Sequence, residues 1–107
     1  MKLIEKKSIK GKIYMGNNMF NISYFYSPTC SICDRQKEIL GQLAAEDDIS
    51  FEDYNIFTDL DKALSLGVHS APAMAIIYEN KSVEILTGFQ ELKTIRERLS
   101  HWLSVVA

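Results

Sequence analysis

The order of apolar runs along the chain restricts its fold more than any other feature of the sequence. From residue 21 onward, short β-prone segments alternate with segments whose apolar residues recur at helical spacing. A strand, a helix and a second strand favour parallel pairing through a right-handed crossover, and a closing hairpin adds antiparallel strands. The sequence therefore predicts an α/β fold with a central mixed β-sheet flanked by helices. We expect strands over 21–26, 50–56, 73–79 and 82–87 and helices over 31–46, 59–66 and 91–104.

Turn and capping residues set the expected boundaries of the later elements. Thr58 is the predicted N-cap of the short helix at 59–66, and Gly67 suits the left-handed position just past its end. Asn80-Lys81 is the predicted turn of the closing hairpin. These positions predict where the short helix starts and ends and where the hairpin turns.

The first 20 residues do not follow the same pattern. Patches of β-like alternation within residues 2–15 predict a hairpin around Lys10-Gly11, and residues 16–18 predict a turn. No linker, repeat or low-complexity tract divides the chain. We therefore expect residues 1–107 to form a single domain with an atypical segment at 1–20.

Composition excludes several classes of function. The chain has 107 residues, 47% of them hydrophobic and 24% charged, a balance typical of globular proteins rather than disordered ones. The net charge of −2 gives no basic excess for nucleic acid or for an anionic membrane. We see no secretory signal and no apolar run long enough for a membrane span. With only two cysteines, the chain is expected in a reducing cytoplasm.

Those two cysteines carry the strongest chemical signal. Cys30 and Cys33 stand three positions apart, directly after the strand at 21–26 and at the start of the predicted helix. The amino end of a helix stabilises a thiolate, and two intervening residues let both sulfurs meet within one turn. Cys33 shares an apolar stripe with Leu40, so we expect it to be buried and Cys30 to be exposed. A redox pair is the favoured interpretation, with a metal site or an inert pair as alternatives.

A second motif precedes the strand at 73–79. It is the segment at 67–72, which ends in Ala71-Pro72. The plain interpretation is a turn proline at the start of a strand. The special one is a cis peptide bond, since cis bonds are nearly confined to X-Pro.

Together these two motifs resemble the thioredoxin family over residues 21–104. The resemblance implies a thioredoxin-like fold with a shortened N-terminal region. It also implies that Cys30 is the attacking cysteine and Cys33 the resolving one. Pro72 would then be the cis-proline that faces the disulfide, and Ala71 would pair its backbone with a substrate peptide. It implies that the protein needs no cofactor. It also implies that the substrates are disulfide-bearing proteins and that a thioredoxin reductase-type protein donates the electrons.

The sequence departs from the family's pattern beside the cysteines. The active-site tryptophan is absent, since Thr29 precedes Cys30. The family's buried aspartate falls at Tyr24 and its lysine partner near Asp53, so the usual proton-relay pair is missing. Tyr26 is the aromatic residue nearest the cysteines.

The two histidines complete the set of candidate site residues. His69 precedes Pro72 by three positions, and we consider it with Tyr26 as a modulator of the pair. His101 lies in the last predicted helix. Their spacing from the cysteines matches no compact zinc pattern, so we predict no metal site.

The resemblance leaves three functions to compare. The first is a protein thiol–disulfide oxidoreductase. The second is a redox-inert interaction module that keeps the fold without the catalysis. The third is a glutaredoxin-like enzyme acting on glutathione mixed disulfides. The glycine pair and acidic residue typical of that class after the hairpin are absent here, since Gly88 is followed by Phe89-Gln90.

Overall fold

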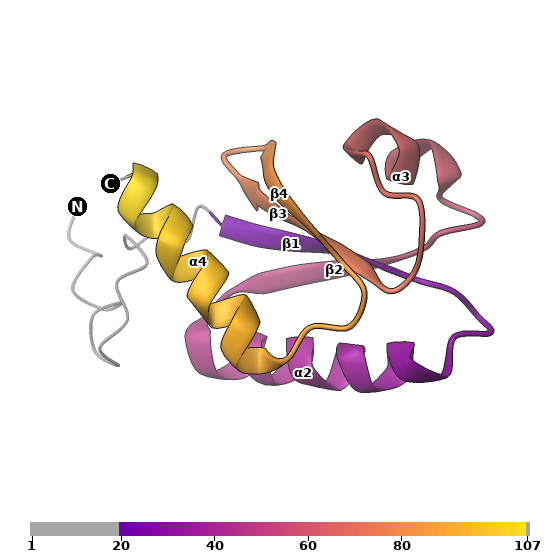
Figure 1. Ribbon diagram of the computed structural model, residues 1–107, viewed down its shortest axis with the longest axis horizontal. Coiled ribbons are helices and arrows are strands. Elements are labelled where there is room, and N and C mark those ends of the chain that lie inside the picture. Colours follow the sequence, from indigo (N-terminus) through magenta and orange to yellow (C-terminus); the bar gives the residue numbers. More distant parts are fainter. Residues whose placement is uncertain (1–19, 107) are drawn as a thin grey trace.

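The computed structural model describes residues 20–106, which form one four-stranded sheet and three helices (Figure 1). In chain order the elements are β1 (Phe20–Tyr26), α2 (Ser31–Asp47), β2 (Ser50–Asn55), α3 (Leu60–Leu66), β3 (Ala73–Tyr78), β4 (Lys81–Thr87) and α4 (Leu92–Val106). The predicted order is confirmed, and every boundary lies within about two residues of expectation, as sequence patterns allow. The hairpin, the turn and the shortened N-terminal region expected before residue 20 lie outside the described residues.

The sheet is mixed, with the strand order β2-β1-β3-β4. β1 pairs with β2 in parallel and with β3 antiparallel, and β4 returns antiparallel to β3. This confirms the predicted parallel pair and the closing hairpin. The carboxyl ends of β1 and β2 therefore meet the amino end of β3 at one end of the sheet, on the right in Figure 1. The loops that carry Cys30 and Pro72 both lie at this end.

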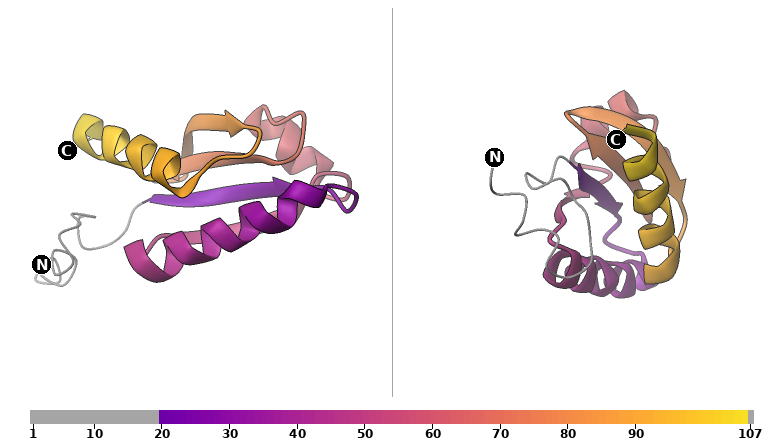
Figure 2. Two further views of the ribbon diagram at one scale, coloured as in Figure 1. Left: turned by 60° about the horizontal axis from the view of Figure 1, so that its bottom comes forward. Right: turned by 90° about the vertical axis from the view of Figure 1, so that its left-hand side faces the viewer.

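The two faces of the sheet bury different clusters because side chains alternate along each strand. Ile22 and Tyr24 of β1 pack with Leu40 of α2 and Leu99 of α4 in the larger cluster. Phe25 of β1 packs instead in the smaller cluster, which includes Ala63 of α3. Thus α2 and α4 cover one face and α3 packs on the other. Figure 2 shows α3 at the opposite end of the molecule from the carboxyl end of the chain. None of the helices in residues 20–106 is long and apolar enough to span a membrane.

The predicted N-cap of α3 is wrong by one residue. Asp59, not Thr58, occupies the N-cap position, and its side chain does not cap the helix. The Asp59 carboxylate instead accepts a hydrogen bond from the Asn55 backbone N–H at 3.1 Å, while the Asn55 side chain accepts one from Phe57 N–H at 2.9 Å. These local bonds close a turn before α3 and delay its start. Gly67 follows the helix at φ 83°, as predicted.

The hairpin turn is also displaced by one residue from its prediction. Glu79 and Asn80 both have positive φ, at 52° and 69°, and Tyr78 pairs with Lys81. Two residues with positive φ form the loop whose twist matches that of the flanking strands. The turn is therefore Glu79-Asn80, and Lys81 begins β4.

Candidate functional site

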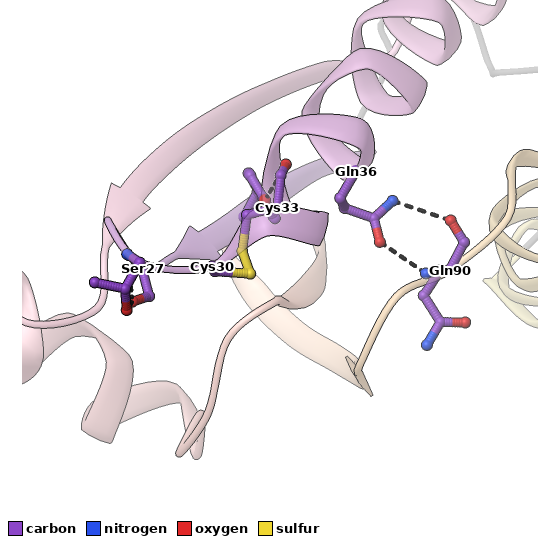
Figure 3. The surroundings of a disulfide bond; sticks show 7 residues. Ser27, Cys30, Cys33, Gln36 and Gln90 are labelled. Carbon is purple, nitrogen blue, oxygen red and sulfur yellow. Dashed lines mark hydrogen bonds between the residues drawn. A yellow bond between two sulfur atoms is a disulfide. The ribbon is translucent and has the colours of Figure 1, made fainter.

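The two cysteines form a disulfide at the amino end of α2 (Figure 3). Their Cα atoms lie 5.4 Å apart, within the range that a disulfide can bridge. Cys30 occupies the N-cap position of α2 and is half-buried, whereas Cys33 lies one turn into the helix and is 4% exposed. Cys30 is thus less exposed than expected, because its side chain packs against the core, but it remains the more accessible of the two.

A tight turn over residues 27–30 places Cys30 at the start of α2. The Cys30 N–H donates to the Ser27 carbonyl at 3.1 Å, and the Thr29 N–H donates to Ser27 Oγ at 3.3 Å. Cys30 keeps an extended backbone and supplies no side-chain cap to α2. The N–H groups of the first helical turn therefore point toward the disulfide end of the helix, where they favour negative charge.

The loop before β3 lies beside the disulfide. The peptide bond between Ala71 and Pro72 is cis, and the Pro72 carbonyl accepts a hydrogen bond from Gly88 N–H at 2.8 Å. Ala71 and Pro72 line the same groove as Cys30. The structure therefore brings together the two motifs that the sequence separates by some forty positions.

Gln36 anchors α2 to the segment that follows β4. It is fully buried, and its side-chain amide donates to the Gln90 carbonyl at 3.0 Å while accepting from the Gln90 N–H at 2.7 Å (Figure 3). The sequence analysis assigned no role to Gln36. Its spacing of three from Cys33, on the buried side of the helix, was the signal that it needed a buried polar partner.

An apolar groove of about 600 Å³ opens on one side of Cys30. Its floor and walls come from the start of α2, from the loop before β3 and from the segment that contains α3. His69 lies exposed along this groove. Sequence reasoning placed His69 near the cysteines but identified none of the apolar residues that α3 contributes.

A smaller polar cavity of about 260 Å³ borders both cysteines as well. Tyr26 and Asp34 line it together with Tyr24, Lys37 and Asp53. The two cavities share Cys30, so the disulfide has an apolar and a polar neighbourhood.

Two contacts join residues that line the polar cavity. The Tyr24 hydroxyl donates to the Cys33 carbonyl at 2.8 Å, and burial raises the pKa of Tyr24 to about 12. Lys37 of α2 forms an ion pair with Asp53 of β2 at 2.9 Å, which holds the pKa of the Asp53 carboxyl below its ordinary value. Asp53 thus has a lysine partner from α2, a contact that sequence reasoning did not find.

The other candidate histidine, His101, lies in α4 and is exposed. His101 contacts the Trp102 ring edge-on, and Trp102 Nε1 donates to a Glu84 carboxylate oxygen at 2.7 Å. His69 and His101 are not brought together with the cysteines as a ligand set. In residues 20–106 no three side chains among His, Cys, Asp and Glu gather closely enough to hold a metal ion.

Comparison with known proteins identifies related chains. The family model described as "TraF: F plasmid transfer operon protein" matches residues 2–100. A probable thioredoxin of Methanothermobacter thermautotrophicus is 38% identical over 58 residues, which cover 52% of this chain and 68% of that protein.

Solved thioredoxin structures share the fold at low sequence identity. A mutant thioredoxin of Halobacterium salinarum superposes with a TM-score of 0.74 at 19% identity, covering 78% of this chain and 74% of the other. Thioredoxin 1 of Thermosipho africanus superposes with a TM-score of 0.70 at 16% identity, covering 80% of this chain and 97% of the other. The predicted thioredoxin-like fold is confirmed.

Proposed function

This chain belongs to the TraF family and is a thioredoxin-like protein, and on that basis we propose that it exchanges its Cys30–Cys33 disulfide with disulfides of client proteins. The observation that carries the proposal is the disulfide itself, at the amino end of α2 and beside the Ala71–Pro72 loop. This arrangement gives a nucleophile, a second thiol within reach and a surface against which a client can lie.

The two cysteines have different roles in this proposal. Cys30 is the attacking residue because it is the more accessible sulfur and because the helix end stabilises its thiolate. Cys33 is the resolving residue because it is buried against Leu40 and meets a client only after Cys30 has bound it. Tyr24 holds the backbone of Cys33 through the hydrogen bond to its carbonyl.

The reaction balances with two electrons. In the reduced protein, the Cys30 thiolate attacks one sulfur of a client disulfide, a mixed disulfide forms, and the other client sulfur leaves as a thiolate that takes up a proton. Cys33 then loses its proton and attacks Cys30 Sγ, which releases the first client sulfur as a second thiolate. The Cys30–Cys33 disulfide is restored and the client is reduced by two electrons. The same steps in reverse oxidise a client dithiol.

The surroundings of the pair suggest how a client is held. No hydrogen bond of the Ala71 backbone occurs within residues 20–106, so its N–H and carbonyl are available to an extended peptide. Tyr26 and His69 border Cys30 from the polar cavity and from the groove, and we assign them a modulating role.

The proposed activity also requires a compartment and an electron donor. We propose that residues 1–107 act as a single domain in the cytoplasm, where a thioredoxin reductase-type dithiol donor returns the pair to its reduced form. A chain with two cysteines has no framework of structural disulfides that would require an oxidising compartment.

Trapping of mixed disulfides tests the proposal. A Cys33→Ser variant retains the attacking thiol but cannot resolve the first intermediate. We expect it to accumulate covalent complexes with client proteins of its host, visible as bands that dithiothreitol removes on gels and identifiable by mass spectrometry.

The matched control is Cys30→Ser, which leaves only the buried sulfur. We expect it to trap far fewer proteins than Cys33→Ser. If Cys33→Ser traps nothing, the chain is a redox-inert interaction module rather than an oxidoreductase. If glutathione is the only trapped adduct, the glutaredoxin-like alternative replaces the proposal.

A further inference from the structure

The fully buried amide of Gln36 differs from most of what α2 buries. Six residues of α2 are buried, and Gln36 and Asp47 are the two polar ones among them. Asp47 is the last residue of the helix, whereas Gln36 lies one turn beyond Cys33 on the same side of it (Figure 3). An apolar side chain would pack the helix against the core without the cost of burying an amide. Packing alone therefore does not account for the amide at this position beside the disulfide.

The Gln36 amide bonds twice to the backbone of a single residue in the segment after β4. Its Nε2 donates to the Gln90 carbonyl at 3.0 Å, and its Oε1 accepts from the Gln90 N–H at 2.7 Å. Because hydrogen bonds depend on direction as well as distance, this pair of bonds fixes the orientation of the segment relative to the helix. The neighbouring residue Arg35 adds a cation–π contact, with its guanidinium carbon 5.9 Å from the centre of the Phe89 ring. The disulfide end of α2 is thus held to this segment at two adjacent positions.

The same segment is joined on its other side to the loop before β3. The Gly88 N–H donates to the Pro72 carbonyl at 2.8 Å. Pro72 and its neighbour Ala71 line the groove that also contains Cys30. A chain of hydrogen bonds therefore runs from α2 through Gln36 and the segment after β4 to the loop that lies beside the disulfide.

We propose that Gln36 is a positioning residue that fixes the Ala71–Pro72 loop relative to the disulfide and thereby favours reaction with extended peptides over reaction with small disulfides. The inference rests on the proposed function, because it concerns the loop along which a client peptide lies. A small disulfide needs only the Cys30 sulfur, whereas a peptide also meets the Ala71 backbone. Displacement of a positioning group by about 1 Å can slow a reaction by about a hundredfold. Loss of the Gln36 amide therefore slows the peptide reaction more than the reaction with a small disulfide.

The test compares two second-order rate constants of the reduced full-length protein. One substrate is hydroxyethyl disulfide, and the other is a short blocked peptide whose cysteine, flanked by alanines, is held in a mixed disulfide with 2-mercaptoethanol. In each reaction the two protein thiols become the Cys30–Cys33 disulfide and the substrate disulfide is reduced to two thiols. In Gln36→Leu the ratio of the peptide rate constant to the hydroxyethyl disulfide rate constant should fall about tenfold. Lower stability alone would not change this ratio, because both substrates meet the same thiolate in the same folded fraction.

Gln42→Leu is the matched control. Gln42 also lies in α2, but its side chain is exposed and donates to Glu46 at 3.1 Å, so the same substitution there should keep the wild-type ratio. Gln36→Met repeats the comparison with an unbranched side chain, and circular dichroism establishes that each variant is folded. Hydrogen exchange of the wild type checks the two links without any substitution. The N–H groups of Gly88 and Gln90 should exchange at least about tenfold more slowly than in an unstructured peptide.

The outcomes separate this inference from the proposed function. A ratio that falls in the Gln36 variants and is kept in Gln42→Leu supports the inference. An unchanged ratio in the folded Gln36 variants, an equal fall in Gln42→Leu, or unprotected N–H groups at Gly88 and Gln90 in the wild type would each overturn it. Failure of the wild type to react even with hydroxyethyl disulfide would overturn the proposed function itself.

Discussion

At the scale of single residues, Tyr24 stands out beneath the disulfide. It is fully buried at a position where the family resemblance places an aspartate, and its hydroxyl donates to the Cys33 carbonyl. A phenol there stays neutral, because burial raises the pKa of Tyr24 to about 12. The residue therefore holds the backbone of Cys33 and adds no charge beneath it.

This raised pKa predicts a loss of stability in alkali. In the unfolded chain Tyr24 loses its proton near pH 10, but in the folded protein it keeps that proton until about pH 12. The stability that the neutral Tyr24 side chain adds to the folded protein is thus complete below pH 10 and is lost as the pH rises toward 12. Between about pH 9 and pH 11 the free energy of unfolding of the wild type should fall by about 1 kcal/mol more than that of Tyr24→Phe.

Urea unfolding at both pH values measures this difference. The pKa of Tyr54 is also raised to about 12 by its hydrogen bond to Glu52, but Tyr54 is present in both proteins and cancels from the comparison. At neutral pH the Tyr24→Phe change should cost about 1 kcal/mol for the lost hydrogen bond. An equal alkaline loss in the two proteins would show that Tyr24 is not held as a buried neutral donor.

At the scale of elements, one arginine of α4 forms ion pairs with the carboxyl end of α2. Arg96 donates to both carboxylate oxygens of Asp47, at 2.9 Å and 3.0 Å, and to Glu46 at 2.6 Å. The Asp47 side chain is fully buried, so this contact lies partly out of water. Two-point contact between a guanidinium and a carboxylate is among the stronger polar interactions in proteins.

Arg96→Ala should therefore destabilise the protein by about 2 kcal/mol, since it leaves the buried Asp47 without the guanidinium. The midpoint of urea unfolding measures the effect, provided that the slope of the transition is unchanged. Lys93→Ala, an exposed substitution one turn earlier in α4, is the matched control and should stay within about 0.5 kcal/mol of the wild type. Equal effects of the two substitutions would contradict this role for Arg96.

Element order was predictable because the apolar periods of strands and helices differ along this chain, whereas details that depend on local polar contacts were not. α3 starts one residue later than predicted, because the Asp59 carboxylate accepts a hydrogen bond from the Asn55 backbone rather than capping its own helix. The partner of the buried Gln36 lies 54 positions away, and no local pattern indicates such a contact. The exposed apolar face of α3 could have been noticed from the spacing of four between Leu60 and Leu64.

At the scale of the whole molecule, the disulfide lies where three segments distant in sequence converge. The turn after β1, the turn before α3 and the loop before β3 all lie at one end of the sheet (Figure 1). They surround the cysteines with an apolar groove on one side and a polar cavity on the other. Uncharged apolar surface thus lies on one side of Cys30, while the charged groups lie in the cavity that borders both cysteines.

The most direct measurement is a redox titration of the Cys30–Cys33 pair. The protein is equilibrated in dithiothreitol buffers of graded potential, and free thiols are counted from the mass added by an alkylating reagent. We predict one reversible transition in which both thiols appear together, with about 30 mV per tenfold change in the ratio of reduced to oxidised protein. Two thiols that stay free at every potential, or a disulfide that opens and does not re-form, would contradict the account.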